Sequence, residues 1–349
     1  MLKVVNFFIN NAGGIEMAHK KMVPGTGGEH YIPYKERLGE KSTVYFTEDL
    51  SAEGVKKIFE RISGNIQGKI GVKLHTGEQH GPNIIPAQWV KELIEDKLPE
   101  AHIVETNTYY EGDRYTTEKH RETLKVNGWT FCPVDILDEE GTTMFPVKDG
   151  KWFTEMSVGK NLADYDSLLV LTHFKGHTMG GFGGSNKNIG IGCADGRIGK
   201  RMIHTVKGSD NLWSIAEEEL MERITESTKS VVDHFGKNIV FINVLRNMSV
   251  SCDCEGTAAA PVVTPNIGIV ASTDILAADQ ASVDLVYALK DADHKDLVER
   301  IETRHGLRQL SYMKELHMGN DRYHLIDIDQ DDKEILPADA VANVKPFQK

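Results

Sequence analysis

The segment LLVLTHFKGHTMGGFGGSNKN (residues 168–188) joins an apolar run to a turn rich in glycine, histidine and lysine. The apolar part, 168–172, is typical of a strand buried on both faces. Glycines let a backbone approach a ligand closely, and ligands of α/β proteins bind where strands end. The segment therefore predicts an α/β fold with a functional site at the C-terminal end of this strand.

Strand-like and helix-like patterns alternate on both sides of this segment. We expect strands over 69–74, 102–105, 239–245 and 267–271, and helices over 52–62, 86–97, 117–126, 215–234 and 275–289. Ser51 and Asp274 are expected as helix N-caps, and Ser214 with Glu217 as a capping box. The alternation predicts two lobes with mostly parallel sheets flanked by helices, and a cleft at the strand C-termini. We expect the first lobe over 43–160 and the second over 161–349, after an N-terminal arm, 1–42, that includes a Gly/Pro-rich loop.

The composition argues against several classes of protein. A net charge of −12 on 349 residues argues against a nucleic-acid-binding surface. No apolar run approaches the ~20 residues that span a membrane, and the first residues lack a secretory pattern. Four scattered cysteines do not form a disulfide framework, which predicts a reducing, cytoplasmic location.

The catalytic candidates lie in the opening segment. His173 and His177 are expected to transfer protons because histidine titrates near neutrality, and Lys187 to neutralise an anion. Lys175 and the backbone of Gly183 and Gly184 are candidates for ligand binding, since a glycine loop before a helix can hold an anion. The alternatives are a satisfied polar histidine at a strand end and a tight turn with a solvated lysine.

Loops after the two preceding strands supply further ligand-binding candidates, namely His75, Glu78, Asn107 and Arg114. An arginine suits carboxylate binding because its guanidinium forms two parallel hydrogen bonds. His204, Cys193, Cys252 and Cys254 are candidate ligands of a divalent metal such as zinc, iron or nickel. Alternatively, the cysteines are small buried hydrophobic residues.

Several motifs resemble the uncharacterised "domain of unknown function 362" family over about residues 43–328. They are KLHTGE (73–78), TNTYYEGDR (106–114), HFKGH (173–177), GFGG (181–184), GIGC (190–193), NVL (243–245), CDC (252–254) and HGL (305–307). The resemblance implies no activity. Many members carry a ferredoxin-like insert after the position of His204, whereas this chain has a short loop, 205–213, there. We therefore expect no iron–sulfur cluster, which would need about four thiolates.

A second, local resemblance is to the lactate racemase family, which uses a nickel-pincer nucleotide. It rests on His177, the GFGG loop, Lys187 and His204. It implies that His177 is a catalytic acid/base, that Lys187 holds a phosphate-bearing cofactor and that His204 binds the metal.

These observations predict a cytoplasmic enzyme, dependent on a metal or a phosphate-bearing cofactor, that acts on a small oxygenated acid as an isomerase or oxidoreductase. The alternative is a non-catalytic metal- or ligand-binding protein, which would need Cys252 and Cys254 exposed and labile. The expected partner is a small-molecule substrate, not a nucleic acid or a membrane. The sequence leaves the oligomeric state open, a homo-oligomer included.

Overall fold

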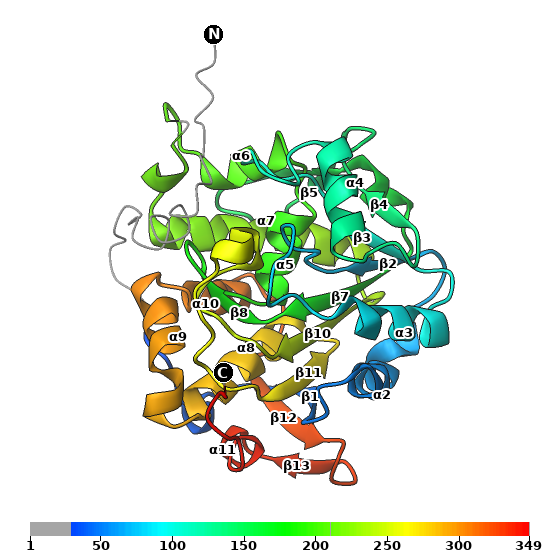
Figure 1. The fold of residues 1–349 in the computed structure, drawn as a ribbon. Coiled ribbons are helices and arrows are strands. Elements are labelled where there is room, and N and C mark those ends of the chain that lie inside the picture. The colour runs from blue at the N-terminus through cyan, green and yellow to red at the C-terminus, as the bar shows by residue number, and fades with distance from the viewer. Residues whose placement is uncertain (1–28, 210, 349) are drawn as a thin grey trace.

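The computed structural model describes residues 29–209 and 211–348, and its central sheet has nine strands (Figure 1). In spatial order these are β13 (Lys333–Ile335), β12 (Arg322–Asp327), β1 (Lys41–Thr47), β11 (Gly268–Ser272), β10 (Ile239–Leu245), β7 (Ser167–His173), β2 (Ile70–Lys73), β3 (His102–Glu105) and β4 (Val134–Ile136). The run from β10 to β4 is parallel throughout, whereas β11 is antiparallel to both of its neighbours. The predicted α/β class with a mostly parallel sheet is confirmed.

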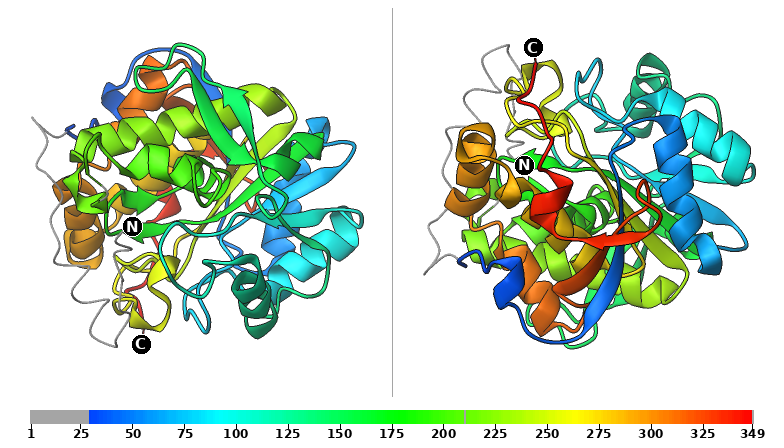
Figure 2. Two further views of the ribbon diagram at one scale, coloured as in Figure 1. Left: turned by 90° about the horizontal axis from the view of Figure 1, so that it is seen from above. Right: turned by 90° about the horizontal axis from the view of Figure 1, so that it is seen from below.

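Helices cover both faces of the sheet (Figure 2). One face carries α2 (Ala52–Ile62), α3 (Ala87–Lys97) and α4 (Thr117–Val126), and the other carries α5 (Ser185–Gly192), α7 (Glu217–Phe235), α8 (Ile275–Ala288) and α10 (Arg308–Glu315). The remaining elements are α6 (Gly199–His204), α9 (Asp291–Thr303), α11 (Pro337–Ala340), and the strand pairs β5 (Thr142–Pro146) with β6 (Glu155–Gly159) and β8 (Lys175–His177) with β9 (Gly181–Gly183). Among the described residues, no helix is long and apolar enough to cross a membrane.

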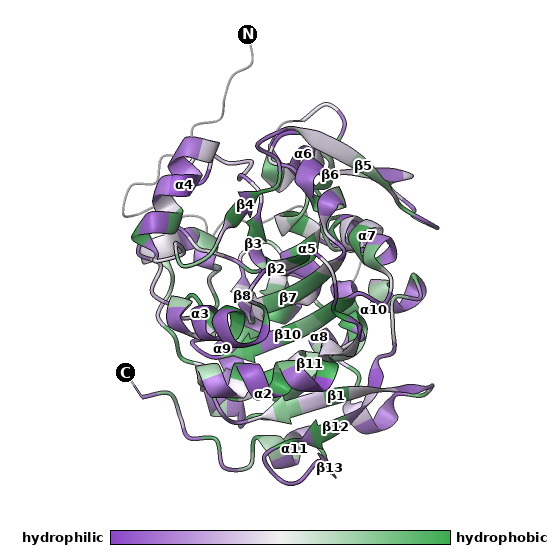
Figure 3. Cartoon of the chain, turned by 90° about the vertical axis from the view of Figure 1, so that its right-hand side faces the viewer, coloured by the Kyte–Doolittle hydropathy of each residue, from purple (hydrophilic) through white to green (hydrophobic). Residues whose placement is uncertain are grey.

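The central strands bury both faces. In β7, Leu168 and Val170 enter the core beneath α5 and α7, while Leu169 and Leu171 enter the core beneath α2 and α3. Successive side chains of a strand point to opposite faces, so an unbroken apolar run fits a strand between two helical layers. Figure 3 shows this apolar sheet inside helices with polar outer surfaces.

The sheet draws its strands from both expected lobes. β2, β3 and β4 come from 43–160, and β2 pairs directly with β7 from 161–349. β1 lies between β11 and β12, which are late in the chain. Within the expected arm, residues 1–28 lie outside the described residues, the Gly/Pro-rich loop among them. Arg37, which is described, forms a buried ion pair with Asp284 of α8. The lobe boundaries themselves stay a prediction.

The N-cap residues Ser51 and Asp274 correctly predicted where two helices begin. The Ser51 hydroxyl accepts from the Gly54 N–H at 3.2 Å, and the Asp274 carboxylate accepts from the Ala277 N–H at 2.9 Å. The predicted capping box of Ser214 with Glu217 is wrong. The helix begins at Glu217 itself after an extended Ala216, and the Ser214 hydroxyl lies 3.0 Å from that of Ser209. Gly236 ends this helix, as predicted.

Candidate functional site

Three parallel strands, β2, β3 and β7, end at the same edge of the sheet, and the loops that follow them line a small, partly open cavity. Its volume is about 70 Å³. Most of the residues that line it are polar or charged types, and five are lysine or arginine: Lys73, His75, Glu105, Thr106, Thr108, Arg114, Lys175, Gly183, Gly184, Lys187, Asn188, Ile191, Gly192, Lys200 and Cys254. Carboxyl ends of parallel strands are the expected position for a ligand in an α/β sheet.

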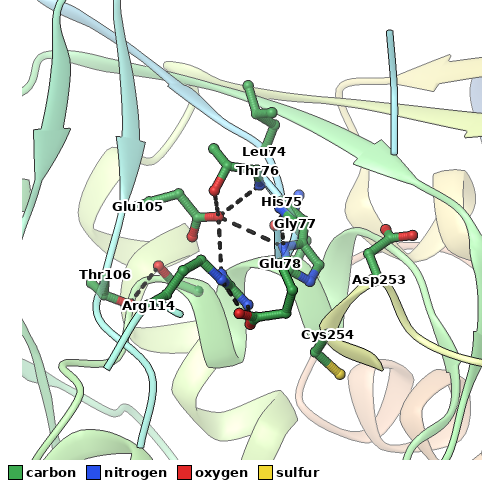
Figure 4. Close-up of polar contacts among 12 residues, drawn as sticks. Leu74, His75, Thr76, Gly77, Glu78, Glu105, Thr106, Arg114, Asp253 and Cys254 are labelled. Carbon is green, nitrogen blue, oxygen red and sulfur yellow. Dashed lines mark hydrogen bonds and ion pairs between the residues drawn. The ribbon is translucent and has the colours of Figure 1, made fainter. Parts of the chain in front are cut away.

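The last residues of β2 and β3 form a buried ion pair on the cavity wall. Lys73 Nζ lies 3.2 Å from Glu105 Oε2 and donates to Asn188 Oδ1 at 3.0 Å. Glu105 also accepts from the backbone N–H of Thr76 at 2.9 Å (Figure 4). Burial opposes the charge of Glu105, yet Lys73 and neighbouring cations hold its pKa well below the ordinary value. This carboxylate therefore stays ionised and fixes the loop that follows β2.

Arg114 contacts two carboxylates at once. Its guanidinium donates to Glu78 Oε1 from Nε at 3.0 Å and from Nη2 at 2.8 Å, and its Nη1 lies 3.6 Å from Glu105 Oε1 (Figure 4). The Tyr110 hydroxyl also donates to Glu78, at 2.5 Å. Glu78 Oε2 is buried and has no hydrogen-bond partner in the described part of the chain. The two candidate ligand-binding residues Glu78 and Arg114 thus bind each other.

Asn107 is placed differently from the prediction. Its side chain donates to Thr117 and faces His120, so it points away from the cavity. Its backbone carbonyl, by contrast, accepts from Lys200 Nζ at 2.6 Å. Asn107 therefore holds Lys200, a residue of the cavity lining, through its main chain.

His173 lies behind the cavity with both ring nitrogens engaged. Nδ1 is 2.8 Å from Asp253 Oδ2, and Nε2 is 2.7 Å from the carbonyl of Arg246. Lys175 Nζ lies 3.1 Å from the same Asp253 oxygen. A ring that faces a carboxylate and a carbonyl has no nitrogen left for a ligand. The geometry therefore makes His173 a residue that positions the Asp253 loop.

Three of the predicted residues meet in one group: potential ligand atoms of His177, Cys252 and Cys254 lie within 4.8 Å of one another. Cys252 Sγ also accepts from the backbone N–H of Cys254 at 3.4 Å and lies 4.0 Å from His75 Nε2. A hydrogen bond from Cys254 and the charge of Lys187 hold the pKa of Cys252 well below its ordinary value, against the effect of burial.

The imidazole of His177 has a defined orientation. Its Nδ1 accepts from the backbone N–H groups of Met179 at 3.2 Å and Gly180 at 2.9 Å. Burial and the charge of Lys187 lower the pKa of His177 to about 4, so the ring is neutral near pH 7. In a neutral ring with Nδ1 accepting, the proton is on Nε2.

The other two predicted metal ligands lie outside this group. Cys193 ends α5 inside the core, where burial raises the pKa of its thiol to about 12. His204 Nδ1 donates to the carbonyl of Lys200 at 2.8 Å, and burial lowers the pKa of the ring to about 4. The sequence could not show this separation, because only the fold decides which distant residues meet.

The glycine turn lines the cavity at Gly183 and Gly184. The first backbone N–H groups of α5 are already occupied, since those of Ser185 and Asn186 donate to the buried Asp279 at 2.7 and 2.9 Å. Lys187, one turn into this helix, is half-buried and has no hydrogen-bond or ion-pair partner among the described residues. A ligand at this loop would therefore meet the lysine side chain.

Four residues of this site were not expected from the sequence. Lys73 and Glu105 could have been found as charged residues at the inner ends of apolar strands. Asp253 lies between two cysteines, which were the metal-ligand candidates of that segment. Lys200 belongs to no recognisable motif.

Comparisons with known proteins give two solved structures of low similarity and one family. The lactate racemase apoprotein from Thermoanaerobacterium thermosaccharolyticum is 12% identical with a TM-score of 0.40, over 76% of this chain and 61% of that one. A protein from Thermotoga maritima is 15% identical with a TM-score of 0.35, over 55% and 49%. The chain thus spans less than two thirds of each of these structures. No curated protein matches it. The model of a domain of unknown function, DUF362, matches residues 70–284, more than half of the chain, and the chain belongs to this family.

Proposed function

We propose that this chain is an enzyme that binds a small oxygenated acid, as its anion, in the cavity at the ends of β2, β3 and β7. One observation carries the proposal: Lys187, which has no carboxylate partner among the described residues, lines a cation-rich cavity together with Cys254 of the His177–Cys252–Cys254 group. Cations in a low-dielectric cavity attract anions far more strongly than cations in water. Isomerisation or oxidation at the hydroxyl-bearing carbon is the reaction class that we favour.

The size of the cavity supports a small ligand. A cavity of about 70 Å³ exceeds the roughly 10–15 Å³ that a single buried water requires, so it has room for more than one water-sized group. A two- or three-carbon hydroxy acid fits this space. Lys187 would bind its carboxylate directly, whereas Arg114 is already engaged by Glu78 and would act through the shape of the wall.

A soft divalent metal is the cofactor that the two sulfurs would hold, and it would supply Lewis acidity toward the substrate oxygen. Cys252 and Cys254 fit this role as neighbouring sulfur donors. His177 fits less simply. Its Nδ1 already accepts two N–H bonds, whereas a metal-bound histidine usually donates from its second nitrogen. His177 would have to yield its Nε2 proton to coordinate, and metal binding would then release a proton.

The non-catalytic alternative receives less support. A carrier would need accessible, labile cysteines, whereas Cys252 is 1% exposed and Cys254 is half-buried against the cavity. The cytoplasmic location, the small-molecule partner and the homo-oligomer remain predictions from the sequence.

Elemental analysis of untagged protein purified without chelators tests the metal. We expect stoichiometric zinc, iron or nickel in the wild type and in Cys132→Ser, whose half-buried cysteine is outside the group, but not in Cys254→Ser. Wild-type protein without metal would remove the cofactor from the proposal. Turnover of small hydroxy acids tests the rest: Lys187→Met should lose it, and full activity of this variant would refute the assignment.

A further inference from the structure

Lys200 is a buried lysine held only by uncharged oxygens. It is 5% exposed, and its ammonium donates to Thr106 Oγ1 at 2.6 Å, to the carbonyl of Asn107 at 2.6 Å and to that of Ala194 at 2.9 Å. All three protons are used, and within the described residues Lys200 has no ion-pair partner. A buried charge without a counterion is costly unless something else compensates it.

The other cations of the wall differ in this respect. Three of them contact carboxylates: Lys73 contacts Glu105 at 3.2 Å, Lys175 contacts Asp253 at 3.1 Å and Arg114 contacts Glu78 at 2.8 Å. Lys187 and Lys200 do not. The cavity lining thus includes two cations without a carboxylate partner: Lys187, which is able to donate directly to a ligand, and Lys200, whose protons are all donated to protein oxygens.

Several titratable groups surround the Lys200 ammonium without contacting it. They are Glu105 and Arg114 on the cavity wall, Asp138 and Asp195 in nearby loops, and Lys73, His120, Cys193 and His204 around them. The two aspartates use their oxygens on other groups, chiefly backbone N–H groups such as those of Gly196 and Gly199. A bound anion would therefore be a new source of negative charge for Lys200.

We propose that Lys200 determines specificity by making the cavity select compact anions with two negative charges. The inference rests on the proposed anion cavity. Lys187 matches one negative charge of the ligand, and the buried ammonium of Lys200 in the cavity lining matches the second. The shared ligand chemistry is a compact dianion, either a single phosphate-like group or a small dicarboxylate.

The titration of Lys200 is consistent with this role. Burial lowers its pKa to about 8, so some of the free protein has neutral Lys200 at mildly alkaline pH. An anion nearby favours the charged form and raises the pKa again. Burial moves the facing groups away from this range: the pKa of His120 is lowered to about 3, that of His204 to about 4, and that of Cys193 is raised to about 12.

Isothermal titration calorimetry with sulfate tests the inference, because sulfate keeps its charge of two at every pH used. Titrations at pH 7 and pH 9.5, each in two buffers of different ionisation enthalpy, give affinity and proton uptake. We expect uptake of up to one proton near pH 8 and above. Each unit by which sulfate raises the pKa of Lys200 corresponds to about a tenfold fall in affinity toward high pH. Malonate in place of sulfate distinguishes a dicarboxylate site from a phosphate-like one.

Variants distinguish the contribution of Lys200 to anion binding from that of the rest of the cavity. Lys200→Met should bind sulfate weakly at both pH values, lose the proton uptake and lose the preference for sulfate over nitrate. Lys200→Arg keeps the charge and should bind equally at both. Lys125→Met removes an exposed lysine of α4 and should behave as wild type. If sulfate binds but wild-type protein takes up no proton and Lys200→Met binds equally well, the role of Lys200 is refuted. If wild-type protein binds none of these anions, the proposed function fails with it.

Discussion

Replacing Arg114 by methionine should destabilise the fold by about 3–5 kcal/mol, because removing one partner of a buried ion pair leaves an uncompensated charge. The structure locates most of this loss at Glu78. That carboxylate loses two hydrogen bonds, at 3.0 and 2.8 Å, and keeps only the one from Tyr110. Glu105 loses a longer contact of 3.6 Å and retains Lys73, so it contributes less.

The loss converts into a measurable shift of the melting temperature. At roughly 2.1 cal/mol/K per residue, the unfolding entropy of a 349-residue chain is about 0.7 kcal/mol/K. A loss of 3–5 kcal/mol therefore lowers Tm by about 4–7 °C if the chain unfolds as one unit. Differential scanning calorimetry at neutral pH measures this directly.

A matched control replaces an arginine with the same contact at the surface. Arg121 lies 2.6 Å from Glu139, but their side chains are 45% and 27% exposed. Arg121→Met should cost less than about 1 kcal/mol, because water screens exposed pairs. Equal shifts in the two variants would refute the reasoning. The double variant Arg114→Met with Glu78→Gln should recover at least about 1 kcal/mol, since it removes the stranded charge.

Two further predictions concern packing and acid stability. A Cβ on Gly176 would lie 2.6 Å from the Val250 backbone, so Gly176→Ala should lower the free energy of unfolding in urea by more than about 2 kcal/mol. Gly64→Ala is the control, because a Cβ there meets no atom within 4 Å and should not cause such a loss. Equal losses in the two variants would contradict this. Burial lowers the pKa of His120 from 6.5 to about 3 and favours the neutral ring in the fold, so stability present above pH 6.5 is lost as pH falls toward 3. His120→Leu should flatten that loss and the exposed His80→Asn should not, and an unchanged slope in His120→Leu would show that other groups cause it.

The secondary structure was largely readable from the sequence because its causes are local. The helices expected over 52–62 and 117–126 match α2 and α4, and the strand expected over 239–245 matches β10. The Ser51 cap and the apolar spacing that follows it act within a few residues. The predicted capping box of Ser214 with Glu217 was wrong because a favourable residue pair does not by itself determine at which residue the helix begins.

The sequence by itself determined the α/β class, the family and the segments from which the site is built, since apolar periodicity, glycine turns and family motifs are properties of neighbouring residues. Only the tertiary structure decided which of these segments touch. It joined His177 to Cys252 and Cys254, left Cys193 and His204 outside their group, and engaged both nitrogens of His173. It also placed Lys200, which no motif marks, in the lining of the cavity. Contacts between residues distant in the chain depend on how the strands pair and the layers pack, and no local pattern encodes that geometry.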